Sequence, residues 1–194
     1  MLRKTFCSLA VILLTCSGAT ASDIRRVVTG LDADNKASTL FDSRLTLKPG
    51  PYGIAAVNLW ITDSYPPALA FKEDPATKPI GISPPDNGTK LRLVEFPPLD
   101  AATEAKMEPN FLMKSVGERA PARGLPVKHP LMHRTRSLDY AVVLSGEIDM
   151  MLDDSLVHLQ PGDVVVQQAT NHGWINRGAR PSRILFVLMD SKER

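Results

Sequence analysis

The sequence predicts an all-β fold, a sandwich or a small antiparallel barrel, in a single domain. The chain has 194 residues, enough for one domain with a hydrophobic core and too few for two ordinary ones. Its 16 prolines and 12 glycines exceed what a helical bundle tolerates and indicate many turns. The last third holds short apolar runs separated by turn residues, without a helical period. A small barrel of this kind encloses one ligand-sized interior.

The first two thirds of the chain contain three predicted strands and a long loop. The predicted strands are residues 24–28, 54–61 and 91–96. The first two are apolar runs, and the third alternates with a period of two. Residues 64–90 contain six prolines and no periodicity, so we expect a loop there. A short helix is expected over 101–108, and residues 109–130 are expected to be irregular.

The last third predicts a succession of short antiparallel strands. Turn residues such as Ser145-Gly146 and Pro161-Gly162 separate its apolar runs. Strands are expected at residues 140–144, 148–152, 156–159, 164–167, 174–175 and 183–189. This spacing favours a closed or nearly closed β architecture.

The first 21 residues have the layout of a secretory signal peptide. Arg3 and Lys4 give a basic start, an apolar run follows from Leu9 to Leu14, and Ala19 and Ala21 fit a small-residue cleavage site. The alternative is an uncleaved membrane anchor. The apolar run is shorter than the roughly 20 residues that a spanning helix needs, which favours cleavage.

Cleavage would leave a single domain at 22–194 in a secreted or periplasmic protein, with no membrane attachment. That mature chain has 21 basic and 21 acidic residues, because Arg3 and Lys4 leave with the signal. Its net charge of zero argues against a nucleic-acid partner. Cys7 and Cys16 leave as well, so the mature chain has no thiol nucleophile or thiolate ligand. A lipid anchor on Cys16 is a further alternative.

All four histidines lie in the last third of the chain, and two of them belong to the candidate site. In an extended chain His133, Thr135 and Asp139 point to one face, and His172 arrives from a later strand end. Two imidazoles and one carboxylate that meet in a dry barrel would suit one divalent metal, Fe(II), Mn(II), Zn(II) or Ni(II). Asp139 capping a turn is the alternative. Surface or structural roles are expected for two histidines, His158 and His129.

Two segments resemble the two motifs of the cupin superfamily. They are residues 129–147 (HPLMHRTRSLDYAVVLSGE) and 162–176 (GDVVVQQATNHGWIN). The positions in register with the motifs are His133, Asp139, Gly146, Gly162, Asp163, His172 and Asn176. The likeness is greatest to the type-2 cupin subgroup. It implies a double-stranded β-helix, or jelly roll, over 22–194, with its core motifs at 129–189.

The chain departs from the cupin motifs at the positions that bind metal. Thr135 stands in the place of the second histidine of His-x-His, and Asp139 stands in the place of a glutamate. The family's four-ligand site is thereby reduced to at most three residues, His133, Asp139 and His172. Two outcomes remain open. The metal is kept with a vacant coordination position, or it is lost.

The resemblance implies an enzyme that acts on a small organic molecule inside the barrel, and the signal peptide implies that it is exported. With a metal, His133, Asp139 and His172 would be both ligands and catalytic residues for a reaction of the oxygenase, decarboxylase, isomerase or lyase type. Without one, either histidine beside Asp139 would act as a general acid or base. The alternative is a non-catalytic module that binds a small ligand.

Three polar and aromatic residues are candidates for contacts with a small-molecule substrate. They are Thr135, Trp174 and Asn176. Trp60 is a candidate for a second apolar wall. Because cupins often dimerise through strand edges, the resemblance also raises a homodimer formed by the strand that begins at Ile24.

Overall fold

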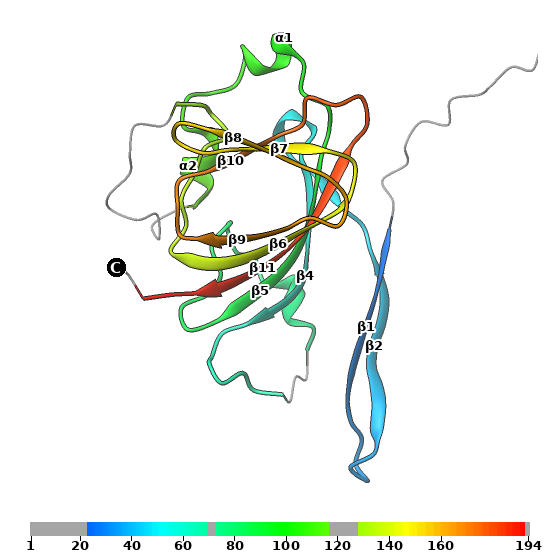
Figure 1. Ribbon diagram of the computed structural model, residues 1–194. Coiled ribbons are helices and arrows are strands. Elements are labelled where there is room, and N and C mark those ends of the chain that lie inside the picture. The colour runs from blue at the N-terminus through cyan, green and yellow to red at the C-terminus, as the bar shows by residue number, and fades with distance from the viewer. Residues whose placement is uncertain (1–22, 70–72, 117–127, 193–194) are drawn as a thin grey trace, which may run out of the picture.

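The computed structural model describes residues 23–69, 73–116 and 128–192, and strands make up most of its regular structure (Figure 1). Two antiparallel sheets form a barrel, and a separate hairpin extends away from it. The predicted all-β fold with jelly-roll architecture is confirmed. The predicted signal peptide at 1–21 lies outside the described residues. It stays a prediction, together with the secreted or periplasmic location.

The larger sheet has six strands in the order β3-β4-β5-β11-β6-β9, with every neighbouring pair antiparallel. The strands are β3 (Lys48–Pro49), β4 (Ala55–Thr62), β5 (Thr89–Phe96), β11 (Ser182–Asp190), β6 (Ser137–Ser145) and β9 (Val164–Gln168). Burial alternates along β6 and β11 with a period of two. One set of side chains therefore faces the barrel interior.

The smaller sheet has three strands in the order β10-β7-β8. Its strands are β10 (Gly173–Ile175), β7 (Ile148–Met151) and β8 (Leu156–Leu159). Side chains from both sheets form the core between them, including Trp174, Met150, Ile184 and Phe186. All six strands predicted in the last third of the chain are present in the structure. Each consists of an apolar run with turn residues on either side.

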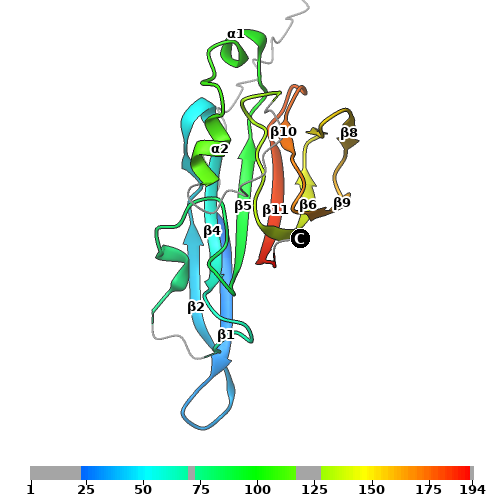
Figure 2. The same cartoon turned by 90° about the vertical axis from the view of Figure 1, so that its left-hand side faces the viewer.

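A two-stranded hairpin stands apart from both sheets. It consists of β1 (Ile24–Leu31) and β2 (Ala37–Leu45), and its tip lies well beyond the barrel (Figures 1 and 2). The hairpin returns the chain to the outer face of the larger sheet, where Leu47 packs with Leu59 and Leu93. The second strand was not predicted, since residues 37–45 have no regular apolar alternation. The homodimer through this strand stays a prediction.

Two short helices differ from the sequence prediction. The helix expected over 101–108 spans only α1 (Ala101–Glu104), and Pro109 disfavours helical geometry in the residue before it. A second helix, α2 (Phe111–Val116), lies where irregular structure was expected. Two 3-10 turns, η1 (Pro51–Gly53) and η2 (Pro75–Thr77), complete the regular structure. No helix in the described part of the chain is long and apolar enough to cross a membrane.

Candidate functional site

The two candidate imidazoles lie against each other. His133 and His172 form an antiparallel bridge, in which each backbone N–H donates to the other's carbonyl at 2.7 and 3.0 Å. Their ring centroids are 4.5 Å apart, with planes inclined at 47°. Both side chains are buried, with 7% and 3% exposure. The bridge therefore joins the start of the first motif segment to the loop before β10.

Backbone hydrogen bonds fix the orientation of both rings. His133 Nδ1 lies 3.2 Å from the Leu131 carbonyl oxygen, and His172 Nδ1 lies 3.0 Å from that of Thr170. A carbonyl accepts only, so Nδ1 carries the hydrogen and Nε2 keeps its lone pair. Burial lowers the pKa of His133 to about 3 and that of His172 to about 4. Both imidazoles are therefore neutral at neutral pH.

Trp174 is the apolar wall beside the imidazoles. Its ring contacts His172 edge to face at a centroid distance of 5.9 Å and Phe186 at 5.5 Å. The expectation that Trp60 provides a second wall is wrong. Trp60 lies near Phe41 and the Arg26 guanidinium of the hairpin, on the outer side of the larger sheet. A bulge between β4 and β5 shifts the register next to it.

Asp139 faces the barrel interior from β6, the strand beside the β9 edge of the larger sheet. It lies opposite Gln167 of β9 and Leu188 of β11, and all three side chains are buried. Burial raises the pKa of the Asp139 carboxyl to about 6, against the opposing effects of the Ser137 hydroxyl and the Lys90 charge. Its Oδ1 atom is shielded from solvent and has no hydrogen-bond partner in the described part of the chain. This oxygen is an acceptor without a donor.

The structure brings together two of the three predicted metal donors. Within residues 23–69, 73–116 and 128–192, no three His, Cys, Asp or Glu side chains lie close enough to hold a metal ion. His133 and His172 provide two nitrogens, while the Thr135 hydroxyl is engaged with that of Ser137 at 2.8 Å. Asp139 does not complete the set. Two metal donors lie together where the predicted site has three. The metal therefore stays a prediction, and these two histidines and Asp139 are considered for chemistry that does not involve a metal.

Asn176 has a structural role, and its expected contact with substrate stays a prediction. Its Nδ2 donates to the carbonyls of Phe96 and Arg180 at 2.9 and 2.8 Å, and its Oδ1 accepts from the Gly178 backbone. Every hydrogen-bonding atom of the amide is engaged except for one lone pair, and the side chain is almost fully buried. Asn176 therefore holds the loop between β10 and β11. The buried Thr135 hydroxyl likewise has a protein partner in Ser137.

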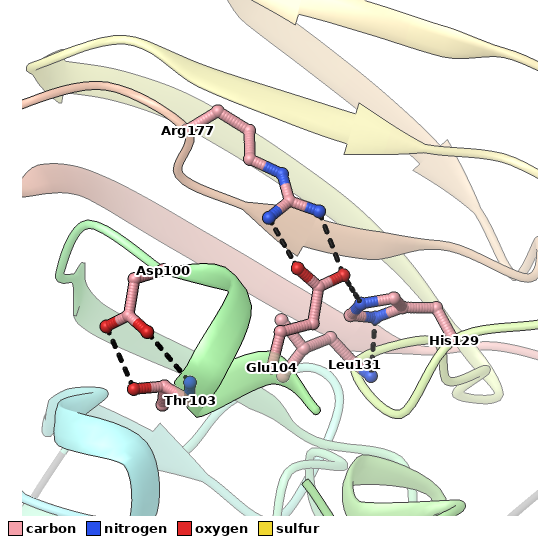
Figure 3. A network of polar contacts seen from close by, with 6 residues as sticks. All are labelled: Asp100, Thr103, Glu104, His129, Leu131 and Arg177. Carbon is pink, nitrogen blue, oxygen red and sulfur yellow. Dashed lines mark hydrogen bonds and ion pairs between the residues drawn. The ribbon is translucent and has the colours of Figure 1, made fainter. Parts of the chain in front are cut away.

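The other two histidines have the structural and surface roles that were expected. His129 lies 2.8 Å from Glu104, which also forms a two-pronged ion pair with Arg177 (Figure 3). Arg177 and His129 hold the pKa of Glu104 down at about 2. This network ties α1 to the β10–β11 loop and to the segment before His133. His158 is exposed and bonds to Asp149 at 2.8 Å.

Two interior cations, Lys90 and Arg92, were missed by the sequence analysis. Lys90 is fully buried and donates to the carbonyls of Gly81, Ile82 and Ser83. Burial, together with the Arg92 charge, lowers the Lys90 pKa to about 7. The sequence did carry one indication. Lys90 and Arg92 are an even number of residues from Val94 and Phe96, which face inward, so all four side chains lie on the same face of β5. Leucines alternate with them along β5, and the sequence did not tell which face was the interior.

Comparisons with known proteins agree with this architecture. The family model "Cupin domain" (Cupin_2) matches residues 124–188. The chain is 49% identical over 69 residues to Phomopsin biosynthesis cluster protein C' of Diaporthe leptostromiformis, covering 34% of this chain and 36% of that protein. It is 36% identical over 100 residues to Cupin-domain-containing oxidoreductase srdD of Neurospora crassa, covering 49% of this chain and 50% of that protein.

Among solved structures, a cupin 2 conserved barrel domain protein from Salinispora arenicola is similar at 11% identity, with a TM-score of 0.39. The match covers 75% of this chain and 82% of that one. The chain spans about a third to a half of the length of the two curated relatives. The motif residues and the family-model match lead to one conclusion: the chain carries a type-2 cupin domain over residues 124–188.

Proposed function

We propose that this chain is a cupin enzyme that transfers protons on a small organic molecule bound between its two sheets. The observation that carries the proposal is Asp139. Its carboxyl is buried, one of its oxygens lacks a partner among the described residues, and its pKa is about 6. A general base works best with a pKa near the working pH and a free oxygen aimed at the proton to be removed.

The two histidines would position the substrate. Both are neutral, and each Nε2 has no hydrogen-bond partner among the described residues, so each offers an acceptor to a hydroxyl of the substrate. Ring orientations are fixed by backbone carbonyls, so little reorganisation accompanies binding. Asp139 would take a proton from carbon or oxygen and return it at another position of the same molecule, which gives an isomerisation or a ring closure. In an elimination it would instead give the proton to a hydroxyl that leaves as water while the carbon–carbon double bond forms. None of these reactions needs an oxidant.

Redox chemistry is the second candidate, favoured by the name of a relative. The Neurospora crassa protein is called a cupin-domain-containing oxidoreductase, and the Diaporthe leptostromiformis protein belongs to a biosynthesis cluster. Both names are in keeping with work on small molecules. A metal-assisted oxygenase or decarboxylase reaction would need a third donor beside His133 and His172.

Deuterium exchange tests the proton-transfer proposal without a known substrate. A panel of 2-keto acids and 1,3-dicarbonyl compounds is incubated with the protein in D₂O, and incorporation at carbon is followed by NMR. Wild-type protein should accelerate exchange of at least one compound, and Asp139→Asn should lose at least about 100-fold of that rate. Asp154→Asn, which changes an exposed carboxylate paired with Lys128, is the matched control.

Two results would redirect the assignment. If compounds bind but none exchanges, the chain is a binding module. If the purified protein carries one transition metal per chain, and His172→Ala loses both the metal and the activity, the metal-assisted reaction replaces the proposed one.

A further inference from the structure

Arg92 is a partly buried arginine of β5 that faces the space between the two sheets. On β5 it pairs with Phe186 of β11, and Phe186 pairs in turn with Ala141 of β6. Residues directly opposite in an antiparallel sheet point to the same side. Phe186 and Ala141 belong to the core between the two sheets, so Arg92 points there as well. Burial is the main cause of the low pKa of His133, and the Arg92 charge is a smaller one.

The Arg92 guanidinium has no ion-pair or hydrogen-bond partner in the described part of the chain. Its Nε atom is shielded from solvent and lacks an acceptor. Several other arginines are paired with carboxylates, for example Arg25 with Asp42 and Arg177 with Glu104. Arg92 is partly buried, and a partly desolvated guanidinium without a partner costs free energy. A fold that keeps one there calls for an acceptor from outside the chain.

The groups around Arg92 favour an anion. Lys90 lies two residues earlier on the same face, and because burial lowers its pKa to about 7 it carries a positive charge in part at neutral pH. The carboxylate of this interior, Asp139, lies beyond ion-pair distance of Arg92 and has its own unpartnered oxygen. The interior thus presents a donor without an acceptor and an acceptor without a donor. Two strand spacings of about 4.8 Å separate their strands, a gap that one small molecule spans.

We propose that the ligand of this interior is a small hydroxy acid, whose carboxylate pairs with Arg92 and whose hydroxyl donates to Asp139. The inference rests on the proposed function and names the substrate class for the same site. Arginine suits this role because its planar fork binds a carboxylate through two parallel hydrogen bonds. The free carboxylate oxygen of Asp139 accepts the hydroxyl hydrogen, which is the proton best placed for removal.

Three hydroxybenzoate isomers and their amides are suitable probes. The 2-, 3- and 4-hydroxybenzoates place the hydroxyl at three distances from the carboxylate, and each matching hydroxybenzamide keeps the shape without the charge. Isothermal titration calorimetry at pH 7.5 should show at least one acid binding at least tenfold more tightly than its amide. Arg92→Met should abolish that preference, Arg92→Lys should retain part of it, and Arg44→Met, at an exposed arginine of β2, should leave it unchanged.

Nitrogen NMR of the wild-type protein provides a readout that does not depend on any variant folding. The Arg92 Nε–H resonance, assigned by its loss in Arg92→Met or Arg92→Lys, should shift on titration with the acid and not with the amide. The proposal is overturned if none of the three acids shifts this resonance, or if a folded Arg92→Met protein keeps the acid-over-amide preference.

The binding test is separate from the turnover test. Acids that bind through Arg92 without any deuterium exchange in the panel would support the ligand class and defeat the proposed enzyme. Exchange that is unaffected by Arg92→Met, with no preference for acids, would support the enzyme and defeat the ligand class.

Discussion

The two faces of the larger sheet each hold a buried or partly buried arginine, in opposite circumstances. On the outer side, Arg26 of the hairpin binds both oxygens of Asp74, the Leu59 carbonyl and the Ser43 hydroxyl. On the inner side, Arg92 has no such partner in the described part of the chain. The difference separates a charge that holds the fold together from one that is available to a ligand. The same contrast applies to carboxylates, since Asp74 is paired and Asp139 keeps an unpartnered oxygen.

The largest effect on stability should come from breaking the outer pair. Asp74→Ala leaves the Arg26 guanidinium buried with only the neutral acceptors Leu59 and Ser43, so the free energy of unfolding should fall by about 3 kcal/mol. Urea unfolding measures the change. Asp42→Ala, which removes the partner of the exposed Arg25, should leave the unfolding midpoint essentially unchanged. Equal losses in the two variants would remove the distinction between buried and exposed pairs.

As the pH falls, the free energy of unfolding should decrease first through the buried histidines of the inner face and only at lower pH through Asp74 of the outer face. Below pH 6.5 the unfolded chain protonates His133 and His172, whereas the folded chain does not do so until about pH 3 and pH 4. The unfolded state then binds more protons, so stability falls as the pH falls. Asp139 opposes this between pH 3.8 and about 6, because its folded pKa is raised, but two groups outweigh one. Pairing with Arg26 lowers the Asp74 pKa, so its contribution is lost only at lower pH.

Thermal unfolding between pH 7 and pH 4.5 checks this order. The Tm of the wild-type protein should fall by several degrees over that range. In the double variant His133→Gln/His172→Gln, the Tm should fall clearly less between pH 7 and pH 4.5 than it does in the wild-type protein. If the Tm falls equally in both proteins, groups other than these two histidines govern the dependence of stability on pH.

A smaller effect is expected from neutralising the inner arginine. Arg92→Met replaces an unpaired guanidinium by an apolar side chain, so the free energy of unfolding should stay within about 1 kcal/mol of wild type or rise. Arg26→Met, matched in chemistry, should be clearly destabilising. A loss above about 2 kcal/mol for Arg92→Met would show that the guanidinium supports the fold and would weaken its assignment to a ligand.

The smallest effect should come from the exposed histidine. His158→Asn removes one hydrogen bond to Asp149 on the surface and leaves the interior untouched. The Tm at pH 7 and the affinity for hydroxybenzoates should both match wild type. A change in affinity would extend the site to the outer edge of the smaller sheet.

The barrel strands could be predicted because their signals are local. Apolar runs bounded by turn residues define β6 to β11, and these runs coincide with the strands in the structure. The second hairpin strand, β2, escaped prediction because its partner is β1 alone and neither strand needs a regular apolar face. Helix α2 escaped because its six residues are stabilised by tertiary contacts such as Phe111 on Tyr52.

The candidate site was predictable in part. The approach of His133 to His172 followed from the motif register, whereas the use of the Asn176 amide by the backbone depends on a distant carbonyl, that of Phe96. Arg92 could not be assigned to the interior, because leucines alternate with it on a strand whose two faces are both covered. Which face is inside is decided by sheet packing, and a single strand does not carry that information.

The hairpin arm gives this protein a natural attachment point. Its turn at Asp32–Lys36 is closed by its own hydrogen bonds and lies at the end remote from the barrel (Figure 1). Exposed turns with local bonding accept insertions more readily than packed segments do. A fluorophore or affinity peptide inserted there would report on the molecule from a distance, leaving the interior chemistry undisturbed.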